Sequence, residues 1–254
     1  MKENNIVAVF IDAENVSSKF ADKIMEEASN YGDVIIKRAF ADWSNGAVEP
    51  WRTAVSKHSI IAEQQFSAVR GKNSGDIALI IDAMVVLFEK NIDVFCLASS
   101  DSDFSRLVQE LRERGKTVVG FGKKITKQEF VNAFTEFIYL DEIKEETPIE
   151  QEVSKDKKVP NRNKTKEQPL LEKGKMKTLV EIIERLIEEG GKALYSQIAK
   201  EMKNKYSDFI PKNYGYKTMK EFMNKLLKNK YTTKTDSDGT TLYFVPKIKN
   251  TTKK

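Results

Sequence analysis

Two patterns of apolar and polar positions alternate over the first 140 residues. Short, mostly continuous apolar runs rich in Val and Ile are typical of strands covered on both faces, and amphipathic stretches of helical length separate them. This alternation predicts an α/β fold with a mostly parallel sheet flanked by helices. The predicted strands cover residues 5–11, 33–40, 59–65, 92–98 and 116–121. The predicted helices cover residues 18–30, 46–57, 76–90, 102–114 and, near the end, 127–135.

The apolar pattern ends soon after 137-FIYL-140, which favours an edge strand, so we predict a first domain over residues 1–142. The following stretch, 144-KEETPIEQEVSKDKKVPNRNKTKEQP-169, has almost no large apolar residues. Such a sequence cannot bury enough surface to offset the entropy lost on ordering. We therefore predict a disordered charged linker over residues 143–174.

Helical periodicity returns at 176-MKTLVEIIERLIEEGG-191, and two more helices are predicted near 195–205 and 217–228. The run 231-YTTKTDSDGTTLYFV-245 has strand-like halves around an Asp-Gly turn, which is a hairpin signal. Three helices and a hairpin predict a small winged-helix α+β domain over residues 175–248.

Charge divides unevenly between these regions. Residues 1–140 carry 17 Lys and Arg against 20 Asp and Glu, whereas residues 176–254 carry 17 against 9. The basic second domain is therefore the expected partner of a polyanion.

Other features exclude whole classes. No apolar run approaches the roughly 20 residues that a membrane-spanning helix needs, and the start, MKENNIVAVF, has no signal-peptide layout. We therefore expect a cytoplasmic protein without a membrane partner. Its single cysteine, Cys96, excludes an intramolecular disulfide and a multi-cysteine zinc site.

Acidic residues follow two predicted strands. The run 6-IVAVFI-11 leads directly into Asp12, and 92-IDVFCLA-98 is followed by two serines and Asp101. In open α/β sheets, ligands bind beyond the carboxyl ends of the strands where the strand order reverses. A strand order of 3-2-1-4-5 places Asp12 and Asp101 at that point, and Asp76 opens a helix at the same edge. We expect these three carboxylates to converge.

Converging carboxylates raise one another's pKa values, and a hard divalent cation relieves the repulsion. Mg²⁺ accepts carboxylates, water and phosphate oxygens as ligands, and a bound metal polarises a phosphoryl oxygen and activates water. We predict a Mg²⁺ or Mn²⁺ site in which the ligands are also the catalytic residues. Each acid has an alternative role as a helix cap, and the capping-box spacing of 100-SDSD-103 makes this strongest for Asp103. The predicted metal-binding and catalytic residues are Asp12, Asp76, Asp101 and Asp103.

Polar and basic residues surround these acids. They would contact phosphate or orient a carboxylate, and the alternative is that they belong to ordinary solvated loops. Asp82 and Glu14 are not predicted as ligands, because Asp82 lies on another helix face and Glu14 lies in a turn. The candidate phosphate- or RNA-binding residues of this region are Asn15, Arg70, Lys72, Ser99, Ser100, Lys123 and Lys124.

Three motifs, 9-VFIDAEN-15, 71-GKNSGDIALIIDAM-84 and 98-ASSDSDF-104, resemble the NYN domain of the PIN-like ribonucleases. The resemblance covers about residues 1–142. It implies a PIN-like α/β fold and Mg²⁺- or Mn²⁺-dependent cleavage of RNA, with the family's acids carried over to Asp12, Asp76 and Asp101 and with Asp103 in the fourth acidic place. There is one departure: many members carry an acid in the last helix where Thr135 stands here, and Glu136 is expected on another face of that helix.

The segments 195-YSQIAKEM-202 and 211-PKNYGYKTMKEFMNKL-226, with the closing hairpin, resemble the LOTUS (OST-HTH) domain, a winged-helix module associated with RNA binding. The apolar stripe of the last helix is predicted to face the core. The opposite face carries lysines, which could meet phosphates beside tyrosines that either stack on bases or belong to the core. The predicted core stripe is Met219, Phe222, Met223 and Leu226, opposite Lys217, Lys220, Asn224 and Lys228. The candidate RNA contacts are Lys212, Tyr214, Tyr216, Lys217 and Lys220.

The leading interpretation is a metal-dependent endoribonuclease with a tethered RNA-binding module. An alternative is a non-catalytic RNA-binding or regulatory protein with a degenerate PIN-like domain, which the Thr135 departure favours. A phosphatase of the haloacid-dehalogenase type is disfavoured, because it needs an Asp two residues after Asp12, where Glu14 stands. Action on DNA and formation of a homodimer are left open.

Overall fold

A computed structural model of the chain describes residues 5–65, 74–141, 171–237 and 239–247. The chain forms two compact units, the first built essentially from residues up to Asp141 and the second from most residues after the predicted linker. Residues 142–170 of that linker lie outside the described residues, so the predicted disorder and the domain boundaries stay predictions. None of the helices in the described segments has the length and apolar content that a membrane crossing requires.

The first unit contains a six-stranded sheet whose neighbouring strands are all parallel. The strand order β3-β2-β1-β4-β5-β6 confirms both the predicted order and the predicted edge strand at the FIYL segment. The order reverses between β1 and β4, which are register partners. The strands are β1 (Ile6–Asp12), β2 (Asp33–Ala41), β3 (Ile61–Gln64), β4 (Val94–Ala98), β5 (Thr117–Gly122) and β6 (Glu136–Tyr139).

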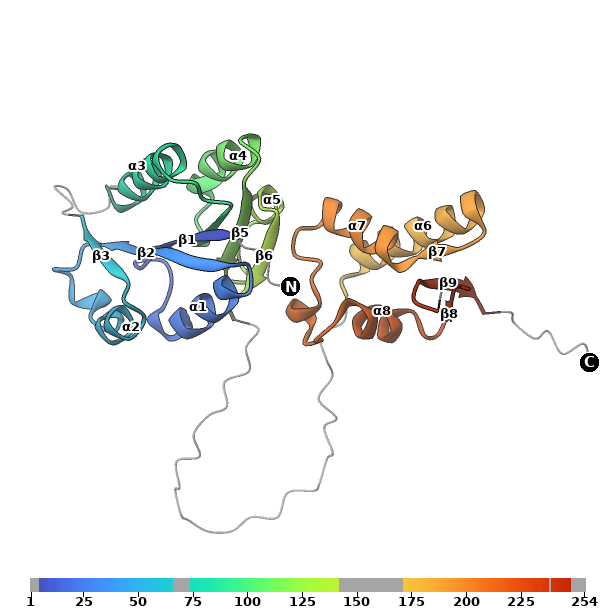
Figure 1. The fold of residues 1–254 in the computed structure, drawn as a ribbon. Helices are drawn as coiled ribbons and strands as arrows, with labels where there is room; N and C mark the ends of the chain where they lie inside the picture. Colours follow the sequence, from blue (N-terminus) through green and yellow to red (C-terminus); the bar gives the residue numbers. More distant parts are fainter. Residues whose placement is uncertain (1–4, 66–73, 142–170, 238, 248–254) are drawn as a thin grey trace, which may run out of the picture. The chain divides into compact units, whose positions relative to one another are not determined.

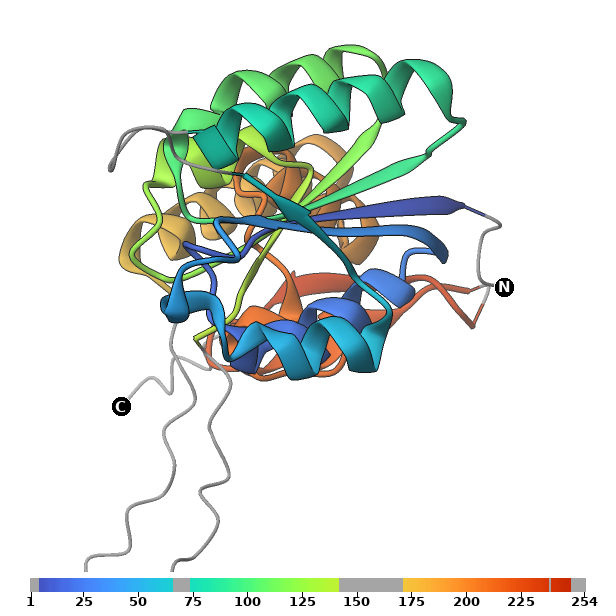
Figure 2. The same ribbon diagram turned by 90° about the vertical axis from the view of Figure 1, so that its left-hand side faces the viewer.

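Helices cover both faces of this sheet. Figures 1 and 2 show α3, α4 and α5 on one face and α1 and α2 on the other. The helices are α1 (Ala21–Ser29), α2 (Trp51–His58), α3 (Ser74–Glu89), α4 (Ser105–Glu113) and α5 (Gln128–Ala133). Short 3₁₀ turns, η1 (Ser18–Phe20), η2 (Gly46–Val48) and η3 (Ser102–Phe104), precede α1, α2 and α4.

The two central strands, β1 and β4, are almost entirely buried. Phe10 of β1 stacks on Phe95 of β4 and Phe40 of β2, with ring centroids 6.1 and 6.4 Å apart. Cys96 is fully buried in β4, and this burial raises the pKa of its thiol. The strands that end near the acids are therefore held in a packed core.

The close packing of β5 and β6 leaves room only for glycine at position 120 of β5. A methyl group on Gly120 would lie 2.4 Å from the ring of Phe137, which packs against Gly120 across the strand pair. Gly120 thus makes room for the aromatic cluster that Phe137 forms with Phe134 and Tyr139.

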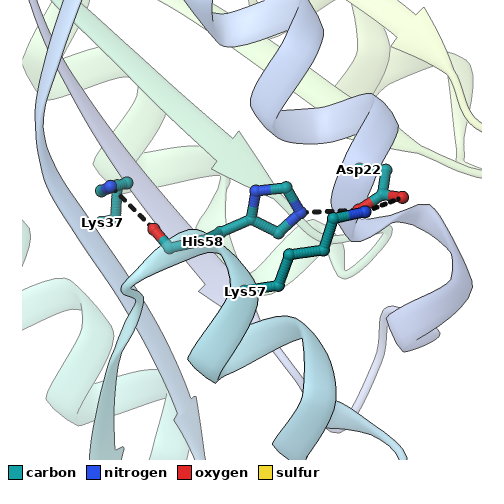
Figure 3. Close-up of polar contacts among 4 residues, drawn as sticks. All are labelled: Asp22, Lys37, Lys57 and His58. Atoms are coloured by element: carbon teal, nitrogen blue, oxygen red, sulfur yellow. Dashed lines mark hydrogen bonds and ion pairs between the residues drawn. The ribbon is translucent and has the colours of Figure 1, made fainter.

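Figure 3 shows a polar cluster between α1 and α2, on the helical face opposite α3. Asp22 of α1 accepts a hydrogen bond from Lys57 Nζ at 2.7 Å and contacts His58 Nε2 at 2.6 Å. Lys37 of β2 donates to the carbonyl of His58 at 2.7 Å. The hydrogen bond from Lys57, followed by that from His58, lowers the pKa of Asp22. The only histidine of the sequence is thus engaged away from the predicted acid site.

The second unit combines helices with a small antiparallel sheet of order β7-β9-β8, in agreement with the predicted α+β architecture. Its helices are α6 (Lys173–Gly190), α7 (Tyr195–Lys205), η4 (Pro211–Tyr214) and α8 (Met219–Leu227). Its strands are β7 (Ala193–Leu194), β8 (Tyr231–Thr235) and β9 (Leu242–Pro246).

Helix α8 buries a slightly different stripe from the predicted one. Thr218 caps the helix by accepting a hydrogen bond from the Glu221 amide at 3.2 Å. Phe222, Met223 and Leu227 are then buried, while Leu226 is only half-buried. The choice of Leu226 as the last core residue was wrong, because the described helix places Leu227, four residues after Met223, on the inner face.

Candidate active site at the carboxyl edge of the sheet

Asp12 and Asp101 lie at the same edge of the sheet. Asp12 is the last residue of β1, and Asp101 follows the end of β4 by three residues. Ile11 and Ala98 are register partners at these two strand ends. Both acids therefore stand where the strand order reverses, the usual ligand position in an open α/β sheet.

Asp12 is nearly buried, with 7% of its surface exposed, and both carboxylate oxygens accept hydrogen bonds. Oδ1 accepts from the backbone N–H of Asn15 at 3.1 Å, and Oδ2 accepts from the Ser99 hydroxyl at 2.9 Å. Burial is the largest influence on this carboxyl and raises its pKa to about 6, although both hydrogen bonds act in the opposite direction. The negative charges of Asp76 and Glu14 raise it further.

Ser99 and Ser100 tie the strand ends together. The buried Ser99 hydroxyl donates to Asp12 and accepts from the Asp101 amide at 3.0 Å. The Ser100 amide donates to Asn15 Oδ1 at 3.0 Å, and the Ser100 hydroxyl accepts from the Lys123 amide at 2.9 Å. The segments that follow β1, β4 and β5 are thus joined by side-chain hydrogen bonds. In this structure the hydroxyls of Ser99 and Ser100 bind groups of these loops.

Asp101 forms the N-cap of η3, with its Oδ1 accepting from the Asp103 amide at 2.9 Å. The capping interaction predicted for Asp103 therefore belongs to Asp101. Asp103 lies two residues further on, in the first turn of η3, and is exposed. One oxygen of Asp101 is engaged in this cap, and the other has no hydrogen bond within the described residues.

Asp76 stands in the first turn of α3 and is partly exposed. Desolvation raises its pKa most, and the charges of Asp101, Asp103 and Glu14 raise it further. Asp76 thus interacts electrostatically with the acids at the ends of β1 and β4. Arg70 and Lys72, the predicted cations of the preceding loop, lie outside the described residues.

The donor set at this edge suits a hard divalent cation. Within the described segments, no lysine or arginine forms an ion pair with Asp12, Asp76 or Asp101, so their charges have no basic counterpart there. Carboxylate oxygens are the ligands that Mg²⁺ and Mn²⁺ prefer. However, the part of the chain that the structure describes holds no group of three or more His, Cys, Asp or Glu side chains close enough to bind a metal ion. The metal site therefore stays a prediction.

Thr135 does not belong to this edge. Its amide donates to the Val118 carbonyl at 2.9 Å, and its hydroxyl accepts from the Val118 amide at 3.1 Å, near the start of β5. Because all strands are parallel, the starts of β5 and β6 lie at the opposite edge from the acids. The following Glu136 was wrongly placed on a helix: it begins β6 and accepts a hydrogen bond from the Tyr31 hydroxyl at 2.6 Å. The threonine at position 135, where many family members carry an acid, therefore gives no information about the completeness of the acid edge.

Asp141 is an acid of this edge that the sequence reasoning missed. It follows β6 by two residues, and both its oxygens accept from the Lys124 amide at 3.0 Å. The signal was present, because an apolar run ending in an acid had already marked Asp12 and Asp101. Lys123 and Lys124 follow β5 at the same edge, as predicted.

The two acids that were set aside have distinct positions. Asp82 is half-buried and pairs with Arg38 of β2, which joins α3 to the sheet. Glu14 lies nearer to the site than expected: its Oε1 accepts from the Asp42 amide at 3.2 Å, and its charge raises the pKa of both Asp12 and Asp76.

In the second unit, the predicted tyrosines belong to the core. Tyr214 and Tyr216 are only 7% and 8% exposed, and their rings pack on Phe222 with centroids 4.6 and 5.2 Å apart. Neither ring is available to stack on a base, so that part of the prediction was wrong. The predicted lysines are exposed: Lys212, Lys217 and Lys220. A tyrosine that the prediction omitted, Tyr243 of β9, is half-buried with Lys192 Nζ 5.4 Å from its ring centroid.

Comparison with known families identifies both units. Residues 6–141, more than half of the chain, match the NYN domain. The chain belongs to the NYN family. Residues 173–242 match the OST-HTH/LOTUS domain, so this NYN protein carries the two modules that the motifs indicated. The NYN domain is part of a nuclease superfamily, which links the protein to RNA-related nucleases.

Individual proteins similar to this NYN protein include an archaeal and a bacterial one. The uncharacterized protein MJ0482 of Methanocaldococcus jannaschii is 28% identical over 127 residues, which are 48% of this chain and 49% of that protein. The chain thus spans about half the length of this curated relative. A protein of unknown function from Vibrio parahaemolyticus, VPA0982, has a solved structure that covers 56% of this chain and 96% of its own, with 20% identity and a TM-score of 0.46.

Proposed function

We propose that this NYN protein is a metal-dependent ribonuclease that hydrolyses RNA phosphodiester bonds, with its LOTUS unit acting as an RNA-binding module. One observation carries the proposal. Asp12 ends β1 and Asp101 follows the neighbouring strand β4, where the strand order reverses. Asp76 interacts electrostatically with both acids, and no described cation pairs with any of the three. Carboxylates are seldom left in this arrangement unless a cation or substrate compensates their charge.

The chain's own residues have separable roles in this proposal. Asp12, Asp76 and Asp101, with Asp103, would hold Mg²⁺ or Mn²⁺, which supplies a Lewis acid for a phosphoryl oxygen and an activated water. Ser99 and Asn15 orient the Asp12 carboxylate through their hydrogen bonds. Lys123 and Lys124 would attract the phosphate backbone to this edge, and Arg70 and Lys72, which precede α3 in the sequence, would add to this attraction.

Cleavage of a fluorescently labelled RNA tests the proposal directly. The wild-type chain should cleave RNA in Mn²⁺ or Mg²⁺ and stop when EDTA is added. Asp101→Asn should reduce the rate by about a hundredfold or more, because the neutral side chain keeps the helix cap but loses the charge that would bind the cation.

A matched control separates charge at the acid edge from charge in general. Asp33 is an exposed acid at the start of β2, on the opposite edge of the sheet. Asp33→Asn should therefore leave the cleavage rate within about twofold of wild type. Metal-independent cleavage, or equal effects of the two substitutions, would contradict the proposal. A DNA strand of the same sequence, assayed in parallel, determines whether the 2′-hydroxyl matters.

A second candidate function is a non-catalytic RNA-binding or regulatory protein. It is favoured by one observation, the lack of a preformed metal-binding cluster within the described residues. The Thr135 departure no longer supports it, because Thr135 lies at the far edge. RNA binding without cleavage in any divalent metal would select this candidate.

The proposed RNA contacts of the LOTUS unit are exposed lysines in α8 and in the segment just before it. Lys217→Ala and Lys220→Ala should each weaken RNA binding several-fold and reduce the salt dependence of log K by roughly one phosphate contact. Lys177, an exposed lysine of α6, provides a charge-matched control. A possible homodimer and a cytoplasmic location remain predictions.

A further inference from the structure

A small pocket opens beside β3, the outer strand on the β2 side of the sheet. Its volume is about 200 Å³, below the roughly 300–1,000 Å³ of sites that enclose a drug-sized molecule. One flat ring system fits such a space. The pocket is lined by Trp43, Val48, Glu49, Arg52, Val55 and Ala62.

The indole of Trp43 is fixed in place with its polar atom already used. Its Nε1 donates to the Glu63 carbonyl at 3.0 Å, and the Trp43 amide donates to Gln64 Oε1 at 3.0 Å. Gln64 is held in turn by Asp42, whose Oδ1 accepts from Gln64 Nε2 at 2.9 Å. Because the ring's only N–H group is satisfied by the protein, Trp43 lines the pocket with carbon surface on a rigid support.

Two other lining residues are charged and exposed. Arg52 and Glu49 form an ion pair at 2.9 Å, and their side chains are 80% and 62% exposed. Such an exposed pair contributes little to stability, so either partner can exchange it for another contact. Arg52 can lie over a flat ring or meet a phosphate, and Glu49 can accept from an exocyclic amino group.

The pocket lies near the acid edge of the same sheet. Trp43 follows the carboxyl end of β2, and Phe40 near that end is the register partner of Asp12. The Asp42 amide donates to Glu14, whose charge acts on Asp12. Since neighbouring strands lie about 4.8 Å apart, β3 is roughly 10 Å from β1. A strand held at Asp12 and Asp101 would therefore pass the pocket with a nearby nucleotide.

We propose that this pocket receives one base of the bound RNA, stacked on Trp43 and contacted by Arg52, at a position flanking the scissile phosphate. The inference rests on the proposed function, because it takes from it that the RNA strand lies along the edge formed by Asp12 and Asp101. Stacking on an aromatic face tolerates all four bases, so Trp43 would supply affinity and Glu49 a preference among bases.

Binding of single-abasic RNAs tests this inference without requiring cleavage. Short labelled RNAs, each lacking one base at a different position, are titrated with the full chain in EDTA or Ca²⁺ and followed by fluorescence anisotropy. In the wild type, loss of the base at one position, or at either of two adjacent positions, should weaken binding about tenfold, within the roughly 5- to 150-fold range of base–aromatic stacking. Trp43→Ala should bind intact RNA about tenfold more weakly than the wild type, and removing the base at that position should then weaken its binding no further. Trp43→Phe should keep most of the affinity for intact RNA and most of the sensitivity to the missing base.

Matched controls come from the opposite helical face. Phe88 is an exposed aromatic of α3 beneath Arg114, which pairs with Glu110 much as Arg52 pairs with Glu49. Phe88→Ala and Arg114→Ala should leave the abasic profile unchanged, whereas Arg52→Ala should weaken binding several-fold. Thermal unfolding verifies that each variant is folded. Should Trp43→Ala lower stability, the Trp43→Phe and Arg52→Ala profiles still decide the matter.

The outcomes distinguish the pocket from the nuclease. An abasic profile that is flat in the wild type, or identical in Trp43→Ala, overturns the pocket even if RNA is cleaved. A Trp43-dependent profile without cleavage in any metal supports the pocket and overturns the nuclease. With cleavage intact, Trp43→Ala should raise KM while changing kcat little, because the base is bound equally in the ground and transition states.

Discussion

Asp12 and Asp22 are the same residue type in two opposite settings. Asp22 contacts Lys57 and His58 on the surface between α1 and α2 (Figure 3), and these hydrogen bonds lower its pKa. Asp12 is buried at the end of β1 without a cation among the described residues, and burial raises its pKa to about 6. A paired surface carboxylate connects two helices, whereas a buried carboxylate without a positive counterpart costs stability and therefore points to a ligand.

The largest expected difference is in catalysis. Asp12→Asn should reduce RNA cleavage by about a hundredfold or more, because the amide cannot supply the negative charge proposed to hold the cation. Asp22→Asn should stay within about twofold of wild type, since it lies between two helices away from the acid edge. Initial rates in Mn²⁺ measure both. Similar losses of activity in the two variants would contradict the proposal that Asp12 binds a catalytic cation and Asp22 does not.

The next effect is the pH dependence of stability in the metal-free protein. Because the folded-state pKa of Asp12 is raised from 3.8 to about 6, the folded protein binds this proton more tightly than the unfolded chain does. Its contribution to stability is therefore fully present below about pH 4 and is lost as the pH rises through about 6. A shift of about two pKa units corresponds to at most about 3 kcal/mol.

Asp12→Asn removes this titration. Urea unfolding in EDTA, repeated between about pH 4 and pH 7.5, should show the wild type losing stability relative to the variant across this window. Parallel stability curves would show that Asp12 has an ordinary pKa. Asp22→Asn should not produce this divergence, because the pKa of Asp22 is shifted downwards.

Metal binding should offset the cost of the acid edge. Mn²⁺ at about a hundred times its dissociation constant should stabilise the wild type by about 2.7 kcal/mol at neutral pH, a rise of several degrees in Tm. Differential scanning fluorimetry with and without Mn²⁺ measures this. The rise should vanish in Asp12→Asn and persist in Asp22→Asn; a rise of equal size in all three proteins would place the metal elsewhere.

The smallest expected effect is that of the paired acid. The lowered pKa of Asp22 contributes stability above its ordinary value of 3.8, and this contribution is lost as the pH falls through the folded-state pKa. Asp22→Asn should therefore change Tm by only about a degree near neutral pH and make unfolding slightly less sensitive to acid. A large loss at neutral pH would mean that the cluster in Figure 3 contributes more than a surface ion pair usually does.

The backbone framework was accessible from the sequence because buried parallel strands leave a plain signal. Apolar runs such as 92-IDVFCLA-98 end abruptly, and a right-handed crossover leaves few strand orders to choose from. The placement of Asp12 and Asp101 followed from that order alone.

Side-chain partnerships were less accessible. Nothing in the pattern shows that the Ser99 hydroxyl joins Asp12 to the Asp101 amide, because this depends on two loops meeting in space. Tyr214 and Tyr216 illustrate a second limit: a tyrosine has an apolar body and a polar tip, so its pattern suits a core and a binding surface equally. Thr135 was misplaced because the predicted helix ran two residues beyond the observed end of α5, at Ala133.

The complete burial of Cys96 in β4 has a practical consequence. The sequence has one thiol, and it lies in the centre of the sheet between strands that end at the candidate site. A thiol reagent can therefore reach it only when the central strands separate, so the rate of its modification measures how often the sheet opens. The protein contains its own single-site reporter of opening, and labelling with and without RNA would show whether a ligand at the carboxyl edge closes the sheet beneath it.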